Sequence, residues 1–204
     1  MYTIKSILPK AILAGIFINI AATIYLSIPN KVVGSLMFTF GLFAVLVTQS
    51  NLYTGMAGYY DNQWKPASHL ITGLIGNAIG CFAYSFCYSL TAKSIDIQPL
   101  AYNLCENKFG NPLLSILMSS IFCGSLMFLA VDTFKKNTNI LGSIVVILCV
   151  SGFILVGFEH SIANISYLAL AQYPITLDVI FKVILMAIGN FIGAYTTRLI
   201  NEKS

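Results

Sequence analysis

The stretch at residues 140–171 limits the possible folds more than any other part of the chain, because it is too apolar for a helix that faces water. It contains no Lys, Arg or Asp, and its only Glu and His are adjacent, at Glu159 and His160. An ionisable side chain inside a membrane segment costs free energy, so as a rule it faces a cavity and has a function. We therefore expect Glu159 and His160 to lie at a break in a membrane-spanning helix.

Composition places the whole chain in the membrane. Hydrophobic residues make up 57% of the sequence and charged residues only 9%, whereas about a quarter of the residues in soluble domains are charged. A helix needs about 20 apolar residues to cross a bilayer, and such runs occur at residues 11–28, 34–60, 68–90, 112–131, 140–171 and 177–200. They predict an all-α membrane protein with six transmembrane helices, in which residues 1–204 form a single transmembrane domain in the lipid bilayer.

The distribution of Lys and Arg predicts the orientation of these helices, since cytoplasmic loops carry an excess of both residues. With six spans, the N-terminus, the second and fourth loops and the C-terminus share one side of the membrane. That side is the more basic one: it has Lys5, Lys10, Lys65, Lys135, Lys136, Arg198 and Lys203, against Lys31, Lys93, Lys108 and Lys182. We expect both termini in the cytoplasm and a location in the plasma (inner) membrane of a prokaryote. The net charge of +4 then reflects topology, and no nucleic-acid partner is expected.

An internal repeat divides the chain into two halves, residues 10–90 and 112–200. The motif Ile-Gly-Asn-x-Ile-Gly occurs at residues 75–80 in the third run and again at residues 188–193 in the sixth. Because each half has an odd number of spans, the second copy must enter the membrane from the opposite side, which predicts two inverted three-helix repeats. The glycines are most simply explained by close helix packing, with Asn77 and Asn190 forming hydrogen bonds between helices.

Spans two and five, which correspond in the two halves, both contain polar interruptions. Four consecutive polar residues at 48–51 interrupt the second run, and residues 157–161 interrupt the fifth. Backbone that leaves the helix at membrane depth is tolerated where protein or a water-filled cavity satisfies it. We therefore predict that each span is broken into half-helices whose positive N-terminal dipoles favour an anion. A continuous helix with buried polar side chains is the alternative for each.

The octapeptide Gly-Phe-Glu-His-Ser-Ile-Ala-Asn at residues 157–164 resembles the fifth-span signature of the formate/nitrite transporter family, whose members are pentameric anion channels that include hydrosulfide and lactate carriers. The resemblance covers nearly the whole chain. It implies an aquaporin-like protomer in a homopentamer. It also implies a set of residues along the pore: the central His160, its partner Thr54, the apolar constrictions Phe38, Phe153, Leu42 and Leu52, the vestibule residue Lys108, and Gly124.

This chain departs from the family pattern at two positions and near its N-terminus. Asn51 replaces the acidic residue that the family usually has in the second-span loop, and Gly124 stands where many members have an asparagine that faces the pore. The N-terminal segment is also shorter than usual, so gating by that segment is in doubt. Glu159, Asn164 and Asn51 are expected to support the helix breaks rather than to contact substrate.

The chemistry of these side chains suits a weak-acid anion. A buried neutral histidine at position 160 can donate a hydrogen bond or relay a proton, and Lys108 can concentrate anions at the mouth. Each residue also has a plainer interpretation. In that interpretation His160 only holds the broken helix, Lys108 is a solvated loop residue, and Phe38 and Phe153 are ordinary core aromatics.

These observations predict a membrane channel or transporter for small monovalent weak-acid anions, such as formate, nitrite or hydrosulfide, with one pore per protomer. Transport would be passive or coupled to a proton. An aquaporin-like channel for small neutral solutes is the alternative, although the paired Asn-Pro-Ala boxes are absent. No enzyme, cofactor or metal site is expected, because the sequence lacks a Ser/His/Asp set, a phosphate loop and the spacing of metal ligands. A purely structural subunit would not need polar breaks in both halves.

Overall fold

The computed structural model describes residues 4–60, 67–137 and 140–202, and every regular element in these ranges is a helix. The helices are α1 (Ile4–Ser27), α2 (Lys31–Val47), α3 (Tyr53–Ala57), α4 (Ala67–Ser89), α5 (Ser94–Phe109), α6 (Leu113–Lys136), α7 (Ile140–Val156), α8 (Ser161–Ala171) and α9 (Leu177–Asn201). Lys65 and Lys203, which contribute to the expected orientation, lie outside the described residues.

Four helices of the described chain, α1, α4, α6 and α9, are long and apolar enough to cross a membrane, and the pair α7 and α8 adds a fifth if its two helices form one span. The shorter α2 is also apolar. Large hydrophobic side chains remain exposed along these helices, for example Phe86 on α4 and Leu148 on α7, which are 69% and 65% exposed. Exposed apolar surface of this extent fits contact with lipid.

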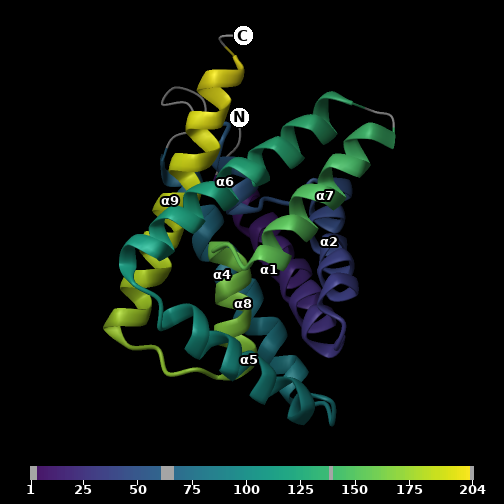
Figure 1. Ribbon diagram of the computed structural model, residues 1–204, viewed down its shortest axis with the longest axis vertical. Helices are drawn as coiled ribbons and strands as arrows, with labels where there is room; N and C mark the ends of the chain where they lie inside the picture. The colour runs from purple at the N-terminus through teal and green to yellow at the C-terminus, as the bar shows by residue number, and fades with distance from the viewer. Residues whose placement is uncertain (1–3, 61–66, 138–139, 203–204) are drawn as a thin grey trace.

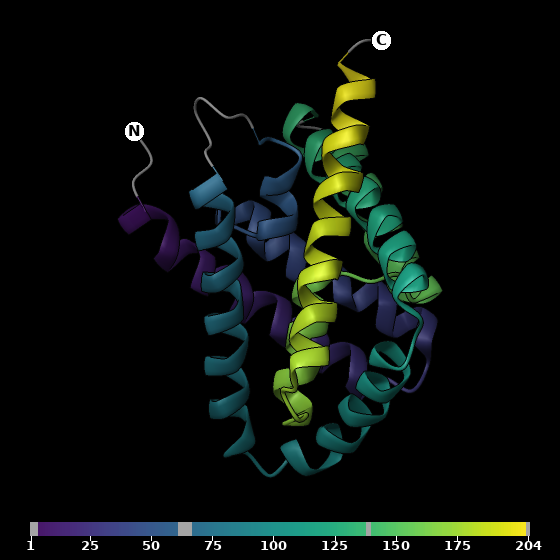
Figure 2. The same cartoon turned by 90° about the vertical axis from the view of Figure 1, so that its left-hand side faces the viewer.

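The helices pack in two similar sets (Figures 1 and 2). In one set α1 packs against α4 and α2, and in the other α6 packs against α9 and α7. The sets meet where α2 lies beside α7 and where α8 packs against α1, α4 and α5. Both chain termini lie at one end of the molecule and α5 lies at the opposite end (Figure 1). We call these the terminal end and the α5 end.

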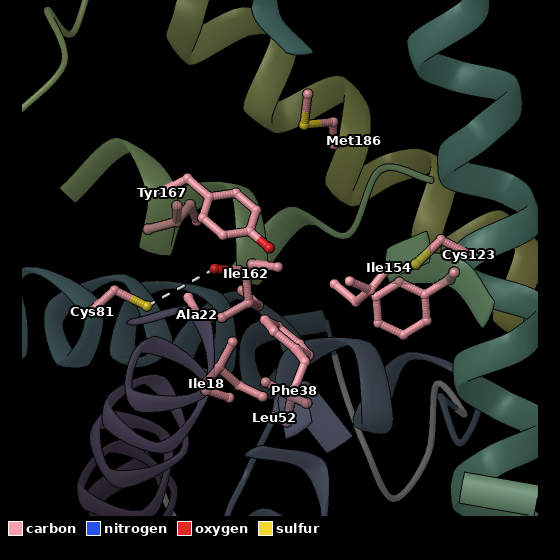
Figure 3. Packing of buried hydrophobic residues seen from close by; sticks show 14 of the residues in the cluster. Ile18, Ala22, Phe38, Leu52, Cys81, Cys123, Ile154, Ile162, Tyr167 and Met186 are labelled. Atoms are coloured by element: carbon pink, nitrogen blue, oxygen red, sulfur yellow. Dashed lines mark hydrogen bonds between the residues drawn. The ribbon is translucent and has the colours of Figure 1, made fainter. Parts of the chain in front are cut away.

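Helix α8 is the centre of the core, since each of its residues is buried. A helix that is buried all round has no polar face, and its sequence is accordingly apolar or small at most positions. Figure 3 shows Ile162 of α8 among Ile18 and Ala22 of α1 and Cys81 of α4. The packing of these small and branched side chains holds the first turn of α8 in the middle of the molecule.

Helix α5 is a feature that the hydrophobic runs do not predict, because residues 94–109 were expected to be a loop. Polar and charged residues are scattered through its sequence, which also includes Pro99, so it carries no signal of a spanning helix. It nevertheless buries Ile97, Ala101 and Cys105 and packs against α8. Lys108 therefore belongs to the last turn of a helix rather than to a loop before the fourth run.

Candidate functional site

The break between α7 and α8 is built on a glycine. Gly157 has a φ of +84°, in the left-handed region that glycine enters without a steric cost. The chain is not helical at residues 157–160, and α8 then begins at an angle of 56° to α7. His160 caps the new helix, because its Nδ1 accepts a hydrogen bond of 3.0 Å from the backbone N–H of Ala163. His160 thus also fixes where α8 starts.

The break between α2 and α3 lies at residues 48–52. Thr48 ends α2 by donating its hydroxyl to the carbonyl of Ala44 at 2.6 Å, and Gln49 has a φ of 52°. Asn51 ties this break to α1, since its backbone N–H donates to Lys10 O at 3.2 Å and its side chain donates to Ile7 O at 3.3 Å. The short helix α3 follows, so the polar residues at both positions coincide with interruptions of the helical backbone.

Two asparagines hold the breaks by the same set of hydrogen bonds. Asn77 Oδ1 accepts from Tyr53 N–H at 2.8 Å, and its Nδ2 donates to Asn51 O at 2.9 Å and to Ala11 O at 2.8 Å. In the other half, Asn190 Oδ1 accepts from Ser161 N–H at 2.9 Å, and its Nδ2 donates to Glu159 O and Ser120 O at 2.8 and 2.9 Å. The repeated asparagine thus replaces the helical hydrogen bonds that each break removes.

The glycines of the repeated motif allow the helices beside these asparagines to approach closely. A Cβ atom on Gly80 would lie 2.0 Å from Ile12 O, and one on Gly193 would lie 1.9 Å from Ile121 O. Gly124 lies at the same contact between α6 and α9 as Gly193, since a Cβ atom on Gly124 would lie 2.1 Å from Asn190 O. The expectation that position 124 faces a pore is therefore corrected: this residue packs against the backbone of α9, where no side chain fits.

His160 and Thr54 bring the two breaks together. Thr54 Oγ1 lies 2.9 Å from His160 Nε2, and the two side chains come from the first turn of α3 and the cap of α8. Both residues are buried. Because Nδ1 already accepts a backbone N–H, the neutral imidazole carries its proton on Nε2 and donates it to Thr54. This leaves the Thr54 hydroxyl hydrogen to be donated elsewhere.

Apolar side chains close the site on two sides. The ring of Phe153 stacks on His160 with centroids 5.4 Å apart, and Phe38 meets Phe153 edge to face at 6.5 Å. Leu42 lies one helical turn after Phe38 on α2, and Leu52 immediately precedes α3. All four are buried in one hydrophobic cluster. The polar pair therefore sits among apolar residues from both halves.

A cavity of about 500 Å³ leads to this cluster from the terminal end. Leu42 and Leu52 form part of its wall, whereas His160 and Thr54 are not among its described lining residues. Its described lining is mostly apolar but includes Lys10, Lys135 and His69, with no Asp or Glu among the described lining residues. The described lining of the cavity is thus mostly apolar and carries basic but no acidic side chains.

On the α5 side of the site, Lys108 and Glu159 form a buried ion pair. Lys108 Nζ lies 2.9 Å from Glu159 Oε2 and also donates to Gly157 O at 3.3 Å, and the two side chains are 12% and 3% exposed. The same carboxylate oxygen accepts from Asn164 Nδ2 at 2.6 Å. Lys108, which the family resemblance places at the vestibule, is therefore neutralised locally by Glu159, and Glu159 and Asn164 form a hydrogen bond beside the break.

Three of the backbone amides at the start of α8 are occupied by protein groups. Ser161 N–H donates to Asn190, Ala163 N–H donates to His160 Nδ1 and Asn164 N–H donates to His160 O. These three donors are therefore not free to bind a ligand, although the half-helix dipole predicted that amides here would face an anion. Sequence reasoning missed this role of Asn190, although its repeated motif was the available signal.

Comparison with known proteins identifies the chain. The sequence model of a family described as "Formate/nitrite transporter" matches residues 1–200. The chain belongs to the formate/nitrite transporter family. This is a family of membrane transporters and channels, not of enzymes, and this member is an integral membrane protein.

Individual relatives agree with this assignment. The chain is 25% identical, over 233 aligned positions, to a formate-nitrite transporter of Plasmodium falciparum (isolate 3D7), with 94% of this chain and 75% of the relative covered. A solved structure described as an FNT family ion channel has a TM-score of 0.83 at 18% identity and covers 98% of this chain and 89% of its own. Another, described as a pentameric formate channel with formate bound, has a TM-score of 0.81 at 23% identity and covers 98% and 94%. The chain therefore has the fold of these solved structures.

Proposed function

We propose that the chain conducts small monovalent weak-acid anions, such as formate, nitrite or hydrosulfide, through a pore within each protomer. The observation that carries this proposal is the contact between His160 and Thr54, where two helix breaks meet at the centre of the fold. The path runs from the cavity at the terminal end, past Leu42 and Leu52, to this pair and then past Phe38 and Phe153. Its support lies in the arrangement of these buried side chains and in the family assignment.

The architecture that we propose has six spans, in which α2 with α3 and α7 with α8 each form one interrupted span. The halves are inverted repeats. The support for this architecture is the duplicated hydrogen-bond set of Asn77 and Asn190, which ties the third span of each half to its own break. One pore per protomer follows, because both breaks that line it lie in the same chain.

The apolar constrictions decide which form of the substrate crosses. An anion that leaves water for an apolar passage loses its hydration, and neutralisation removes most of that cost. A weak acid can be neutralised by a proton taken up in a water-filled mouth, and it then passes the leucines and phenylalanines as the neutral acid. Transport of this kind moves one proton with each anion.

His160 acts in this scheme as a hydrogen-bond donor, not as the source of the proton. Its Nδ1 accepts from the amide of Ala163, which cannot supply a proton in exchange. If Nε2 gave up its hydrogen, it would leave an imidazolate in an apolar site. The Nε2–H and the Thr54 hydroxyl instead donate to the oxygen or sulfur atoms of the passing acid, and they replace water at the narrowest part of the path.

The assembly and location follow from the family. We propose a homopentamer in the plasma (inner) membrane of a prokaryote, with both termini in the cytoplasm. The name of one similar structure, a pentameric formate channel with formate bound, supports the oligomer and the substrate class. The exposed apolar side chains along the spans offer the surface for lipid and for neighbouring copies.

Reconstitution tests the proposal. Purified protein in liposomes should take up formate, with alkalinisation outside if a proton accompanies it. Phe153→Trp should abolish uptake because the larger ring fills the path beside His160. Leu148→Trp, which enlarges an exposed residue on the same helix, is the matched control and should retain uptake. Equal uptake by the two variants, or osmotic water flux without any formate uptake in the unmodified protein, would overturn the proposal.

A further inference from the structure

The two helix breaks can be compared position by position, because the hydrogen bonds of Asn77 and Asn190 define equivalent residues. Asn190 donates to Glu159 O and accepts from Ser161 N–H, two residues later. Asn77 donates to Asn51 O and accepts from Tyr53 N–H, also two residues later. Asn51 in the first half is therefore equivalent to Glu159 in the second.

The side chains at these equivalent positions differ in charge. Glu159 accepts from Lys108 Nζ at 2.9 Å and from Asn164 Nδ2 at 2.6 Å, so the lysine at the α5 end has a carboxylate partner. Asn164 lies five residues after Glu159, and the residue five after Asn51 is Met56. The break of the first half thus has neither the carboxylate that neutralises the lysine of the second nor the amide that donates to this carboxylate.

A lysine nevertheless stands beside this neutral position. The backbone of Asn51 donates to Lys10 O, and its side chain reaches Ile7 O, one turn away on the same face of α1. Asn51, Met56 and Lys10 all line the 500 Å³ cavity. Within residues 4–60, 67–137 and 140–202, Lys10 takes part in none of the ion pairs, and the side chain is exposed.

We propose that Asn51 sets the affinity of the cavity at the terminal end for anions, because it leaves the charge of Lys10 uncompensated. This inference rests on the proposed anion conduction and adds to it an asymmetry between the two mouths. At the terminal end an anion meets an unpaired cation in a basic, mostly apolar cavity. At the α5 end it meets a lysine whose charge Glu159 has cancelled. The two faces of the protein therefore bind the same anion with different strength.

Asn51→Asp tests this inference directly, since it places a carboxylate beside Lys10 at the position equivalent to Glu159. Proteoliposomes that carry a C-terminal affinity tag are separated on resin into those with the terminal end outward and those with it inward. Initial rates of formate uptake are then measured in each fraction over a range of formate concentrations. From the terminal end, Asn51→Asp should raise the half-saturating concentration about fivefold, the effect of one unit charge acting through water at about 4 Å. From the α5 end the value should not change.

Three further variants separate charge from structure. Asn51→Leu removes the hydrogen bond to Ile7 without adding charge, and it should leave the half-saturating concentration near that of the unmodified protein. Lys10→Gln should raise it about fivefold from the terminal end only, on the same electrostatic grounds, and combining it with Asn51→Asp should raise it further, because each change makes the cavity one unit charge more negative. Asn111→Asp adds a carboxylate in the connection between α5 and α6 and should not affect uptake from the terminal end.

Specific outcomes would overturn the inference. They are an unchanged half-saturating concentration in both Asn51→Asp and Lys10→Gln, or shifts of equal size from both faces. A failure of the proposed function looks different, because the unmodified protein would then take up no formate from either face.

Discussion

The ion pair of Lys108 and Glu159 should be far more important for stability than its distance suggests. Its two side chains are 12% and 3% exposed, whereas those of Lys93 and Asp96, which pair at 3.7 Å, are 84% and 68% exposed. Removal of one partner from a buried pair leaves an unpaired charge and costs about 3–5 kcal/mol, whereas an exposed pair contributes about 1 kcal/mol or less. We therefore expect Glu159→Gln and Lys108→Met each to lower the free energy of unfolding by about 3 kcal/mol or more, and Lys93→Met by about 1 kcal/mol at most.

The double variant distinguishes a charge effect from a packing effect. With both charges gone, no unpaired ion remains, so the combination of Lys108→Met and Glu159→Gln should cost no more than either change alone. Unfolding by SDS in mixed micelles, followed by circular dichroism, gives the four free energies of this cycle. Additive losses, or single losses as small as that of Lys93→Met, would refute the reasoning that a neutralised charge pair holds this break.

Three other sets of substitutions test the site and the residues that support it. Asn77→Leu and Asn190→Leu should each lower the free energy of unfolding by about 2 kcal/mol, since each removes three hydrogen bonds that in membranes are worth about 0.6 kcal/mol apiece; unequal losses would argue against equivalent roles. Gly193→Ala should destabilise by more than the 1–3 kcal/mol typical of overpacking, because backbone atoms must move, while Gly152→Ala, which meets no atom within 4 Å, should be neutral or stabilising in the same titration. Thr54→Val keeps the shape of the side chain and should cost about 1 kcal/mol of stability yet lower formate flux in liposomes about tenfold or more; unchanged flux would exclude the hydroxyl from the path.

The sequence was most informative where a local rule has a single structural solution. Polar residues at 48–51 and the pair Glu159 and His160 predicted interruptions of the backbone, because polar groups in an apolar run must be satisfied by protein or by a water-filled cavity. The motif around Asn77 and Asn190 predicted close packing and hydrogen bonds between helices. It did not reveal that both asparagines bind the breaks, since that depends on which helix lies opposite and not on spacing along the chain.

Other features depend on tertiary contacts that leave no local pattern. Helix α5 is only partly apolar and contains a proline, so its position beneath α8 is visible only in three dimensions. Gly124 carries no sign in the sequence of whether it faces a pore or a neighbouring backbone. The partner of Lys108 was likewise hidden, because Glu159 lies 51 residues away.

Each break is held by its own asparagine, and this has a consequence for how the protein folds. Asn77 fixes one break using only α1, α3 and α4, and Asn190 fixes the other using only α6, α8 and α9. If the chain is cut at residues 90–93, before α5, the hydrogen bonds of each asparagine stay within one fragment. Two co-expressed fragments should therefore recombine into the native fold. During synthesis of the uncut chain, the first half can fold before the second half has emerged from the ribosome. The hydroxyl of Thr54 and the imidazole of His160 then meet only in the final docking step.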